Sequence, residues 1–277
     1  MERRDKATQT TTPDEPFDAI LTYMEDELSF ATSHYNEDYL DRRISSRIRR
    51  TGSDGYDDYY DVLQSDPDEQ EAVLEAMSIN VTGFFRNPEV WSGIRDVLRE
   101  LTAERRTVRI WSAPCADGRE PYSLSMLAHD DPDIDDSAIR ILGTDISDPA
   151  LETAREGVYE SSRTTDIADQ LSFLDDPSDY IEEDNDTFRI TEPIKRPVTF
   201  ERHDLINDRP RSGFELVLCR NLFIYIDSEY KRPILEMFAD GLETDGYLVI
   251  GKAETLPRDL QSTFASHDST LRIYRRE

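Results

Sequence analysis

Cysteine is scarce in this sequence of 277 residues, and lysine occurs at only four positions. The two cysteines, Cys115 and Cys219, show no metal-ligand spacing and are too few for a disulfide framework. Both follow apolar, strand-like runs, which favours small buried side chains over a redox pair. The four histidines are also scattered without metal-ligand spacing, so we predict no metal site.

Long apolar runs are absent as well. No stretch approaches the roughly 20 apolar residues that a membrane-spanning helix requires. The first residues, MERRDKATQTTTPDEP, contain no apolar core of the kind found in signal peptides. We therefore predict a cytoplasmic protein without membrane insertion.

Positive charge is the third deficit, because 60 Asp and Glu residues against 32 Lys and Arg residues give a net charge of −28. A hydrophobic content of 37%, with 13 Tyr and 11 Phe, is nevertheless too high for a wholly disordered chain. The scarcity of lysine and the acidic runs, such as Asp130-Asp131, resemble the salt adaptation of halophiles and predict a halophilic archaeal source. A merely acidic mesophilic protein is the alternative. The composition offers no broad basic surface, which speaks against nucleic-acid binding.

The apolar periodicity changes near residue 105. Before it, apolar residues such as Leu40 and Ile44 recur at helical spacing, which predicts a helical domain over residues 17–104 after a loose tail at 1–16. Over residues 105–277 short strands alternate with helices, which predicts an α/β domain with a mostly parallel sheet covered by helices. Ligands of such sheets bind beyond the carboxyl ends of the strands.

The interval 158–197 interrupts this alternation. It is too long for an ordinary connection, and its TFRITEPI run, residues 187–194, has strand-like alternation. The interval is either a small inserted β-subdomain or a mobile acidic loop, and we favour the subdomain.

The segment RIWSAPCADGREPYS, residues 109–123, has the pattern of a buried strand, a tight turn and the start of a helix. Gly118 permits close backbone approach, and Asp145 ends the next strand, where a carboxylate can accept hydrogen bonds from ribose hydroxyls. Asp117 and Glu120 argue against a phosphate, because a helix N-terminus that binds phosphate favours bare N–H groups. A nucleoside with a cationic tail fits better, and S-adenosylmethionine has that description. On the residues alone, Glu120 could instead cap the helix and Asp145 could be an ordinary loop residue.

Several segments in the same order resemble the successive motifs of the CheR family, S-adenosylmethionine-dependent methyltransferases that esterify glutamate side chains of chemotaxis receptors. They are NVTGFFR (80–86), RIWSAPCADGREPYS (109–123), GTDIS (143–147), AREGVY (154–159), LCRNLFIYID (218–227) and GYLVIGKAET (246–255). The resemblance implies a helical N-terminal domain joined to a Rossmann-like methyltransferase domain with a small β-subdomain. It also implies cytoplasmic receptor helices as partners and S-adenosylhomocysteine as a product, and we expect a monomer. The alternatives are a non-catalytic module that senses S-adenosylmethionine or docks on receptors, and a methyltransferase acting on a small molecule or RNA.

The resemblance also assigns roles to individual residues. Arg86 and Tyr225 are the implied catalytic residues: Arg86 can orient the substrate carboxylate, and Tyr225 can direct its hydroxyl or ring edge toward the methyl group. No base is needed, because a glutamate side chain with a pKa of about 4.3 is already ionised near neutral pH. This sequence departs from the family's pattern at Arg119, where an acid is common, and at Asp204, where asparagine is frequent. The implied cofactor-binding residues are Asn80, Thr82, Arg86, Gly118, Glu120, Asp145, Asp204, Leu205, Arg220 and Asn221.

Basic charge is concentrated in residues 39–50, where five arginines and one aspartate give a balance of five minus one, or +4. On a helix, Arg43, Arg47 and Arg50 share one face, which we predict to point outward and to bind the receptor. A solvated face without a partner is the alternative.

Overall fold

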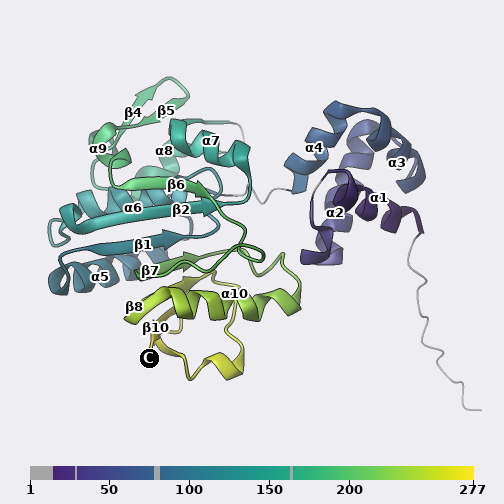
Figure 1. The fold of residues 1–277 in the computed structure, drawn as a ribbon. Helices are drawn as coiled ribbons and strands as arrows, with labels where there is room; N and C mark the ends of the chain where they lie inside the picture. The colour runs from purple at the N-terminus through teal and green to yellow at the C-terminus, as the bar shows by residue number, and fades with distance from the viewer. Residues whose placement is uncertain (1–14, 29, 78–81, 163–164) are drawn as a thin grey trace, which may run out of the picture. The chain divides into compact units, whose positions relative to one another are not determined.

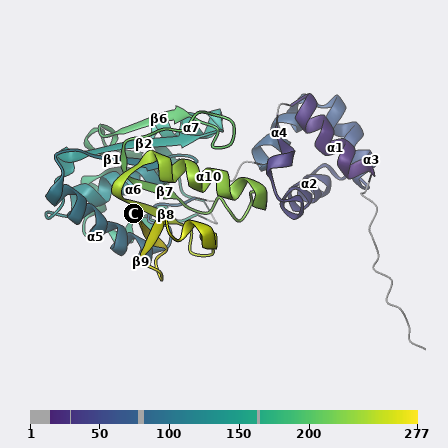
Figure 2. The ribbon, with the colours of Figure 1, turned by 60° about the horizontal axis from the view of Figure 1, so that its bottom comes forward.

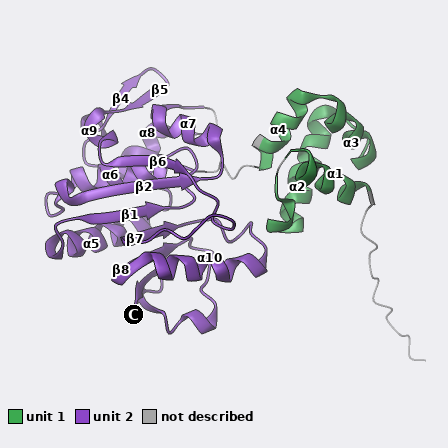
Figure 3. Ribbon diagram, viewed as in Figure 1, with its two compact units in different colours: residues 1–78 green, residues 79–277 purple. Residues whose placement is uncertain are grey.

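The computed structural model describes residues 15–28, 30–77, 82–162 and 165–277. The chain divides into two compact units, Met1–Ser78 and Ile79–Glu277 (Figures 1 and 3). Unit 1 is all-helical, as predicted, and buries Ile20, Tyr59 and Leu63 among its helices. Its helices are α1 (Glu15–Asp26), the short η1 (Thr32–His34), α2 (Glu37–Thr51), α3 (Tyr56–Ser65) and α4 (Pro67–Met77).

Arg47 of α2 does not point outward, contrary to the prediction. Its Nε donates to Glu69 of α4 at 2.9 Å, and its Nη2 makes a second, shorter contact with the same carboxylate. The hydroxyl of Tyr59 donates to Glu69 at 2.6 Å, and Glu69 is only 5% exposed. Because α4 packs against α2, the guanidinium neutralises a buried carboxylate inside unit 1.

We expect Arg47→Ala to destabilise unit 1 by about 3 kcal/mol, because removing one partner of a buried ion pair leaves the other charge uncompensated. Arg50→Ala removes the same charge from an exposed position of the same helix and is expected to change stability by less than about 0.5 kcal/mol. Urea unfolding followed by circular dichroism measures both variants. Equal urea midpoints for the two variants would show that the ion pair between Arg47 and Glu69 contributes nothing to the stability of unit 1.

Unit 2 is built on a seven-stranded sheet with the order β6-β2-β1-β7-β8-β10-β9. The pairs β6–β2, β2–β1, β1–β7 and β7–β8 are parallel, whereas β10 runs antiparallel to both β8 and β9. The mostly parallel sheet is therefore confirmed. Its strands are β1 (Val108–Ser112), β2 (Ile139–Asp145), β6 (Val198–Arg202), β7 (Phe214–Cys219), β8 (Leu242–Ile250), β9 (Phe264–Asp268) and β10 (Ile273–Arg276).

Helices cover both faces of this sheet (Figures 1 and 2). The chain leaves β1 for β2 on one side and leaves β7 for β8 on the other, so two right-handed crossovers place α6 and α10 on opposite faces. The order reverses between β1 and β7, where such folds bind their ligands. The main helices are α5 (Pro88–Glu104), α6 (Arg119–Asp130), α7 (Asp148–Glu156) and α10 (Ser228–Gly241).

The structure divides the chain after residue 78, whereas the sequence periodicity had placed the boundary at residue 104. The difference lies in α5, which the helical spacing assigned to the N-terminal domain. Its apolar face, with Trp91, Ile94 and Leu98, belongs to the same core as sheet residues such as Ile110. Amphipathic spacing identifies a helix but does not say which core the apolar face enters.

The interval 158–197 forms the predicted inserted β-subdomain. An antiparallel sheet has the order β3-β5-β4, from β3 (Val158–Glu160), β5 (Thr187–Ile190) and β4 (Ile181–Asp184). The short helices α8 (Ile167–Gln170), η3 (Leu171–Phe173), η4 (Pro177–Asp179) and α9 (Glu192–Lys195) complete it. Among the described helices of the whole chain, none combines the length and the apolar character needed to cross a membrane.

Candidate functional site

The loop after β1 packs tightly against its neighbours. Gly118 has a φ of 87°, and a Cβ there would lie 2.7 Å from the Cβ of Ala154 and 2.9 Å from the Phe200 ring. Only glycine meets both the left-handed conformation and the close packing without strain. Gly118 therefore lets the loop turn into α6 directly against α7 and β6.

Asp145 lies at the carboxyl end of β2 and holds the same loop from the other side. Its Oδ2 accepts the Ala116 N–H at 2.8 Å, and its Oδ1 accepts the Ser147 N–H at 3.0 Å. Burial raises the pKa of this carboxyl, although the two backbone donors act in the opposite direction. Each carboxylate oxygen keeps a lone pair for a further donor, as a ribose diol would supply.

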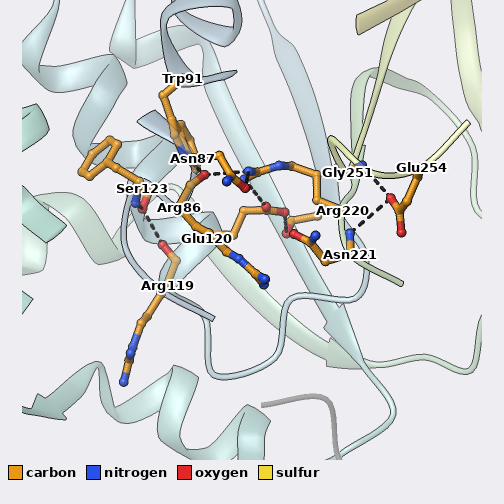
Figure 4. A network of polar contacts seen from close by, with 12 residues as sticks. Arg86, Asn87, Trp91, Arg119, Glu120, Ser123, Arg220, Asn221, Gly251 and Glu254 are labelled. Carbon is orange, nitrogen blue, oxygen red and sulfur yellow. Dashed lines mark hydrogen bonds and ion pairs between the residues drawn. The ribbon is translucent and has the colours of Figure 1, made fainter. Parts of the chain in front are cut away.

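Glu120, in the first turn of α6, belongs to a buried polar cluster (Figure 4). Its Oε1 accepts the Ser112 hydroxyl at 2.9 Å, and its Oε2 accepts Nη1 of Arg220 at 3.0 Å. The side chain of Arg220 is 3% exposed and lies over the Trp91 ring. Residues from the ends of β1 and β7 and the start of α6 thus meet at the reversal point of the sheet.

Arg220 also fixes the backbone at Arg86. Its Nη2 donates to the Arg86 carbonyl at 2.6 Å, and Nε1 of Trp91 donates to the same oxygen at 3.0 Å. The flanking residues Phe85 and Asn87 have φ values of 47° and 60°, so the chain turns sharply here. In Figure 4 the Arg86 side chain points away from the Arg220 cluster. The structure therefore places the backbone of Arg86 beside Arg220, which in turn pairs with Glu120.

A buried carboxylate that the sequence interpretation did not single out organises the loop after β7. Glu254 is 4% exposed and accepts the N–H groups of Phe223 at 2.7 Å, Gly251 at 2.6 Å and Asn221 at 3.2 Å. Burial raises its pKa. These contacts stabilise the loop that carries Asn221, which has a φ of 62°, and Tyr225, which is half-buried. The available signal was an acid four residues after the end of the buried run of β8.

The carboxylate of Asp204 accepts hydrogen bonds from residues of its own loop. Its Oδ1 accepts the N–H groups of Ile206 at 2.8 Å and Asn207 at 3.2 Å, and its Oδ2 accepts Nδ2 of Asn207 at 2.9 Å. Asp204 and the adjacent Leu205 are half-buried. Asn80 lies outside the described residues, whereas Thr82 is half-buried and its carbonyl accepts Nη1 of Arg119 at 3.5 Å.

Arg119 and Asp117 compensate each other's charge in the first loop. The Arg119 guanidinium lies 3.3 Å from the Asp117 carboxylate and 5.0 Å from the centre of the Tyr159 ring. Burial raises the pKa of Asp117, and its Oδ1 has no hydrogen-bond partner among the described residues. A buried carboxylate oxygen without a donor suits a ligand that carries a cationic or N–H donor.

Comparisons with known proteins agree with this geometry. Residues 80–273 match the family described as "CheR methyltransferase, SAM binding domain", and residues 15–78 match "CheR methyltransferase, all-alpha domain". The chain belongs to the CheR methyltransferase family. It is therefore an S-adenosylmethionine-dependent methyltransferase, and the division between the two CheR domains coincides with the division between units 1 and 2.

Named relatives align along most of the chain. The "Chemotaxis protein methyltransferase" of Listeria monocytogenes is 32% identical over 227 residues, which cover 80% of this chain and 83% of the relative. The protein of the same name from Borreliella burgdorferi is 30% identical over 230 residues, covering 78% and 80%. The "Probable biofilm formation methyltransferase WspC" of Pseudomonas putida is 31% identical over 78% of this chain and 51% of its own length.

Proposed function

We propose that this CheR-family enzyme transfers a methyl group from S-adenosylmethionine to glutamate side chains of chemotaxis receptors. The observation that carries the proposal is the match of both units, in order, to the two CheR domains, together with relatives named as chemotaxis protein methyltransferases. We propose further that the enzyme acts as a cytoplasmic monomer. A halophilic host is also proposed, and this part of the proposal is supported by the acidic composition.

Acidic side chains at the reversal point of the sheet suit this cofactor. When bound, S-adenosylmethionine supplies a methyl group activated by a positively charged sulfur. Asp145 would accept hydrogen bonds from the ribose, and the carboxylates of Asp117 and Glu120 would favour the positive charges. The other residues proposed to line the cofactor site are Asn80, Thr82, Arg86, Gly118, Asp204, Leu205, Arg220 and Asn221.

The catalytic proposal needs alignment and no base. The substrate carboxylate is ionised near neutral pH, so the enzyme has to hold it in line with the methyl group and exclude water. Arg86 would orient that carboxylate, and Tyr225 would direct its hydroxyl or ring edge toward the transferring group. The interaction between Arg86 and the substrate carboxylate has to be of moderate strength. The carboxylate loses its charge in the transition state, so a strong ion pair would stabilise the ground state more than the transition state.

The arginines of α2 are the proposed contact with the receptor. All five basic residues of the span 15–78 lie between Arg42 and Arg50. Arg50 is exposed, and the guanidinium of Arg43 lies 5.1 Å from the centre of the Tyr39 ring. Arg47 is committed to Glu69, so Arg43 and Arg50 carry the proposal. Guanidinium groups pair well with the carboxylates of an acidic receptor helix.

We expect Arg43/Arg50→Ala to reduce methylation of a receptor cytoplasmic domain at least about tenfold, because each close arginine–carboxylate pair contributes on the order of 1 kcal/mol. Affinity for S-adenosylmethionine, measured by calorimetry, should stay unchanged. The matched control Arg140/Arg275→Ala removes two exposed arginines of unit 2, one near the amino end of β2 and one in β10. Receptor methylation at the wild-type rate by the first variant would remove α2 from the docking surface.

A labelled-methyl assay tests the proposed function. The enzyme, S-adenosylmethionine with a radioactive methyl group and a receptor cytoplasmic domain should yield labelled receptor that releases its label in base, as esters do. The rate should rise from dilute buffer to molar salt, because the Debye length falls to about 3 Å and repulsion between two acidic proteins is screened. Label that resists base would indicate N-methylation and contradict the proposal.

A further inference from the structure

The inserted subdomain contacts the Arg86 segment directly. Oε1 of Gln170, the last residue of α8, accepts the Phe84 N–H at 2.8 Å. The ring of Phe173 stacks on Phe85 with centroids 4.9 Å apart. The ring of Tyr159 meets Phe84 edge to face at 5.1 Å. The insert is therefore packed against the residues immediately before Arg86.

The side-chain amide of Gln170 lies directly against the backbone of Gly83 and Phe84. A Cβ at Gly83 would lie 3.0 Å from Oε1 of Gln170, so the glycine leaves room for this amide. The hydrogen bond fixes a backbone N–H, and a buried or half-buried N–H without an acceptor is destabilising. Gln170 thus has a defined partner and little freedom to shift.

The remaining polar contacts of the segment come from elsewhere in unit 2. The Phe85 N–H donates to the Ser123 hydroxyl at 3.1 Å, and the Arg86 carbonyl accepts from Trp91 and Arg220. Phe85 and Asn87 both have positive φ, a conformation that persists in such residues only when the surroundings hold it. Gln170 holds the start of this strained turn, and the other contacts hold its end.

We propose that Gln170 is a positioning residue for methyl transfer, which holds the Phe84 N–H and through it the direction of the Arg86 side chain. The inference rests on the proposed role of Arg86 and extends it to the inserted subdomain. The subdomain then contributes to the active-site geometry in addition to any contact it makes with a partner. A displacement of about 1 Å in a catalytic group can cost on the order of a hundredfold in rate.

Two substitutions separate the hydrogen bond from the volume of the side chain. Gln170→Met keeps the length and removes the acceptor, and we expect it to lower kcat roughly tenfold to a hundredfold. Gln170→Glu keeps an oxygen acceptor at the same position and should restore kcat to within about threefold of wild type. The dissociation constant for S-adenosylmethionine should stay close to wild type in both variants. The melting temperature should fall by a few degrees in Gln170→Met, where the Phe84 N–H loses its acceptor, and should stay close to wild type in Gln170→Glu. A loss of kcat that is equal in the Met and Glu variants would overturn the proposal.

A double-mutant cycle tests whether Gln170 acts through Arg86. In an Arg86→Lys background, followed by single-turnover transfer of a labelled methyl group, Gln170→Met should add less than about a twofold loss, because residues that act as a unit are not additive. If the rate losses of the two single substitutions multiply in the double variant, Gln170 acts independently of Arg86, which would contradict the proposal.

Hydrogen exchange of residues 82–87 supplies a readout that needs no substrate. Gln170→Met should speed amide exchange in this peptide, and Gln170→Glu should not. Unchanged exchange in Gln170→Met would overturn the inference about Gln170, whatever the enzyme's substrate. A wild-type enzyme that binds S-adenosylmethionine but leaves the receptor unmethylated would overturn the proposed function instead.

Discussion

Asp145→Ala is expected to abolish measurable binding of S-adenosylmethionine. The substitution removes the proposed acceptor for the ribose hydroxyls, and it also frees the N–H groups of Ala116 and Ser147, which hold the first loop against the end of β2. An unpaired buried donor costs about 1–3 kcal/mol, so the combined loss should exceed a hundredfold in affinity. Calorimetry on a variant shown to be folded measures the effect.

Asp145→Asn separates charge from hydrogen bonding. Its amide oxygen can still accept from one backbone N–H, so the loop should persist while affinity falls less than in the alanine variant. Affinity in Asp145→Ala equal to that of wild type would remove Asp145 from the cofactor site.

The affinity of the wild-type enzyme for S-adenosylmethionine should depend on pH through Asp145. Burial raises the pKa of this carboxyl, so the protonated form persists closer to neutrality than it does in an exposed aspartate. The protonated form is the weaker acceptor, and affinity should therefore fall as the pH is lowered through the raised pKa. Asp145→Asn is the control, because it has no proton to gain and should lose this component of the pH dependence.

Arg86→Ala and Tyr225→Phe are expected to reduce turnover far more than they weaken cofactor binding. Both residues are proposed to act on the transferring group, so the losses should be at least about a hundredfold in kcat, or roughly 2.7 kcal/mol of transition-state stabilisation. The dissociation constant for S-adenosylmethionine should rise by much less than kcat falls, with the larger rise in Arg86→Ala because Arg86 also lines the proposed cofactor site. Single-turnover kinetics together with calorimetry measure the two effects separately.

Arg140→Ala is the matched control for Arg86→Ala, because Arg140 is exposed near the amino end of β2, away from the reversal point of the sheet. It should retain wild-type turnover. Losses of equal size in turnover and in affinity would show that Arg86 and Tyr225 act in cofactor binding alone.

Much of the fold could be predicted because its signals are local. The strands β1 (VRIWS), β2 (IRILGTD) and β7 (FELVLC) are rich in apolar residues, as buried parallel strands require, and Ser147 and Pro149 stand at the positions typical of a helix start. Strand β9 carries too little local signal to be predicted, because in its sequence FASHD one buried residue is followed by exposed or half-buried ones at the edge of the sheet. The assignment of α5 to a unit depended on long-range packing that periodicity does not contain.

The candidate site also combines residues that local sequence signals predict with residues whose roles depend on long-range contacts. Glu120 and Asp145 stand at the ends of recognisable elements, so their neighbourhood follows from topology. Glu254 and Gln170 act on backbone groups at distant positions, and no spacing in the sequence connects Glu254 with Phe223 or Gln170 with Phe84. The direction of Arg47 depended on a buried acid in another helix, which a helical wheel of α2 alone does not include.

Mass spectrometry of the methylated receptor identifies the side chains that receive the methyl group. Full-length enzyme, S-adenosylmethionine and a receptor cytoplasmic domain are incubated in high salt, and the receptor is digested and sequenced at acidic pH to preserve esters. We expect added methyl groups on glutamate side chains that are lost after brief treatment with base, and we expect none with Arg86→Ala. Methyl groups on nitrogen, or an unmodified receptor beside an enzyme that binds its cofactor, would contradict it.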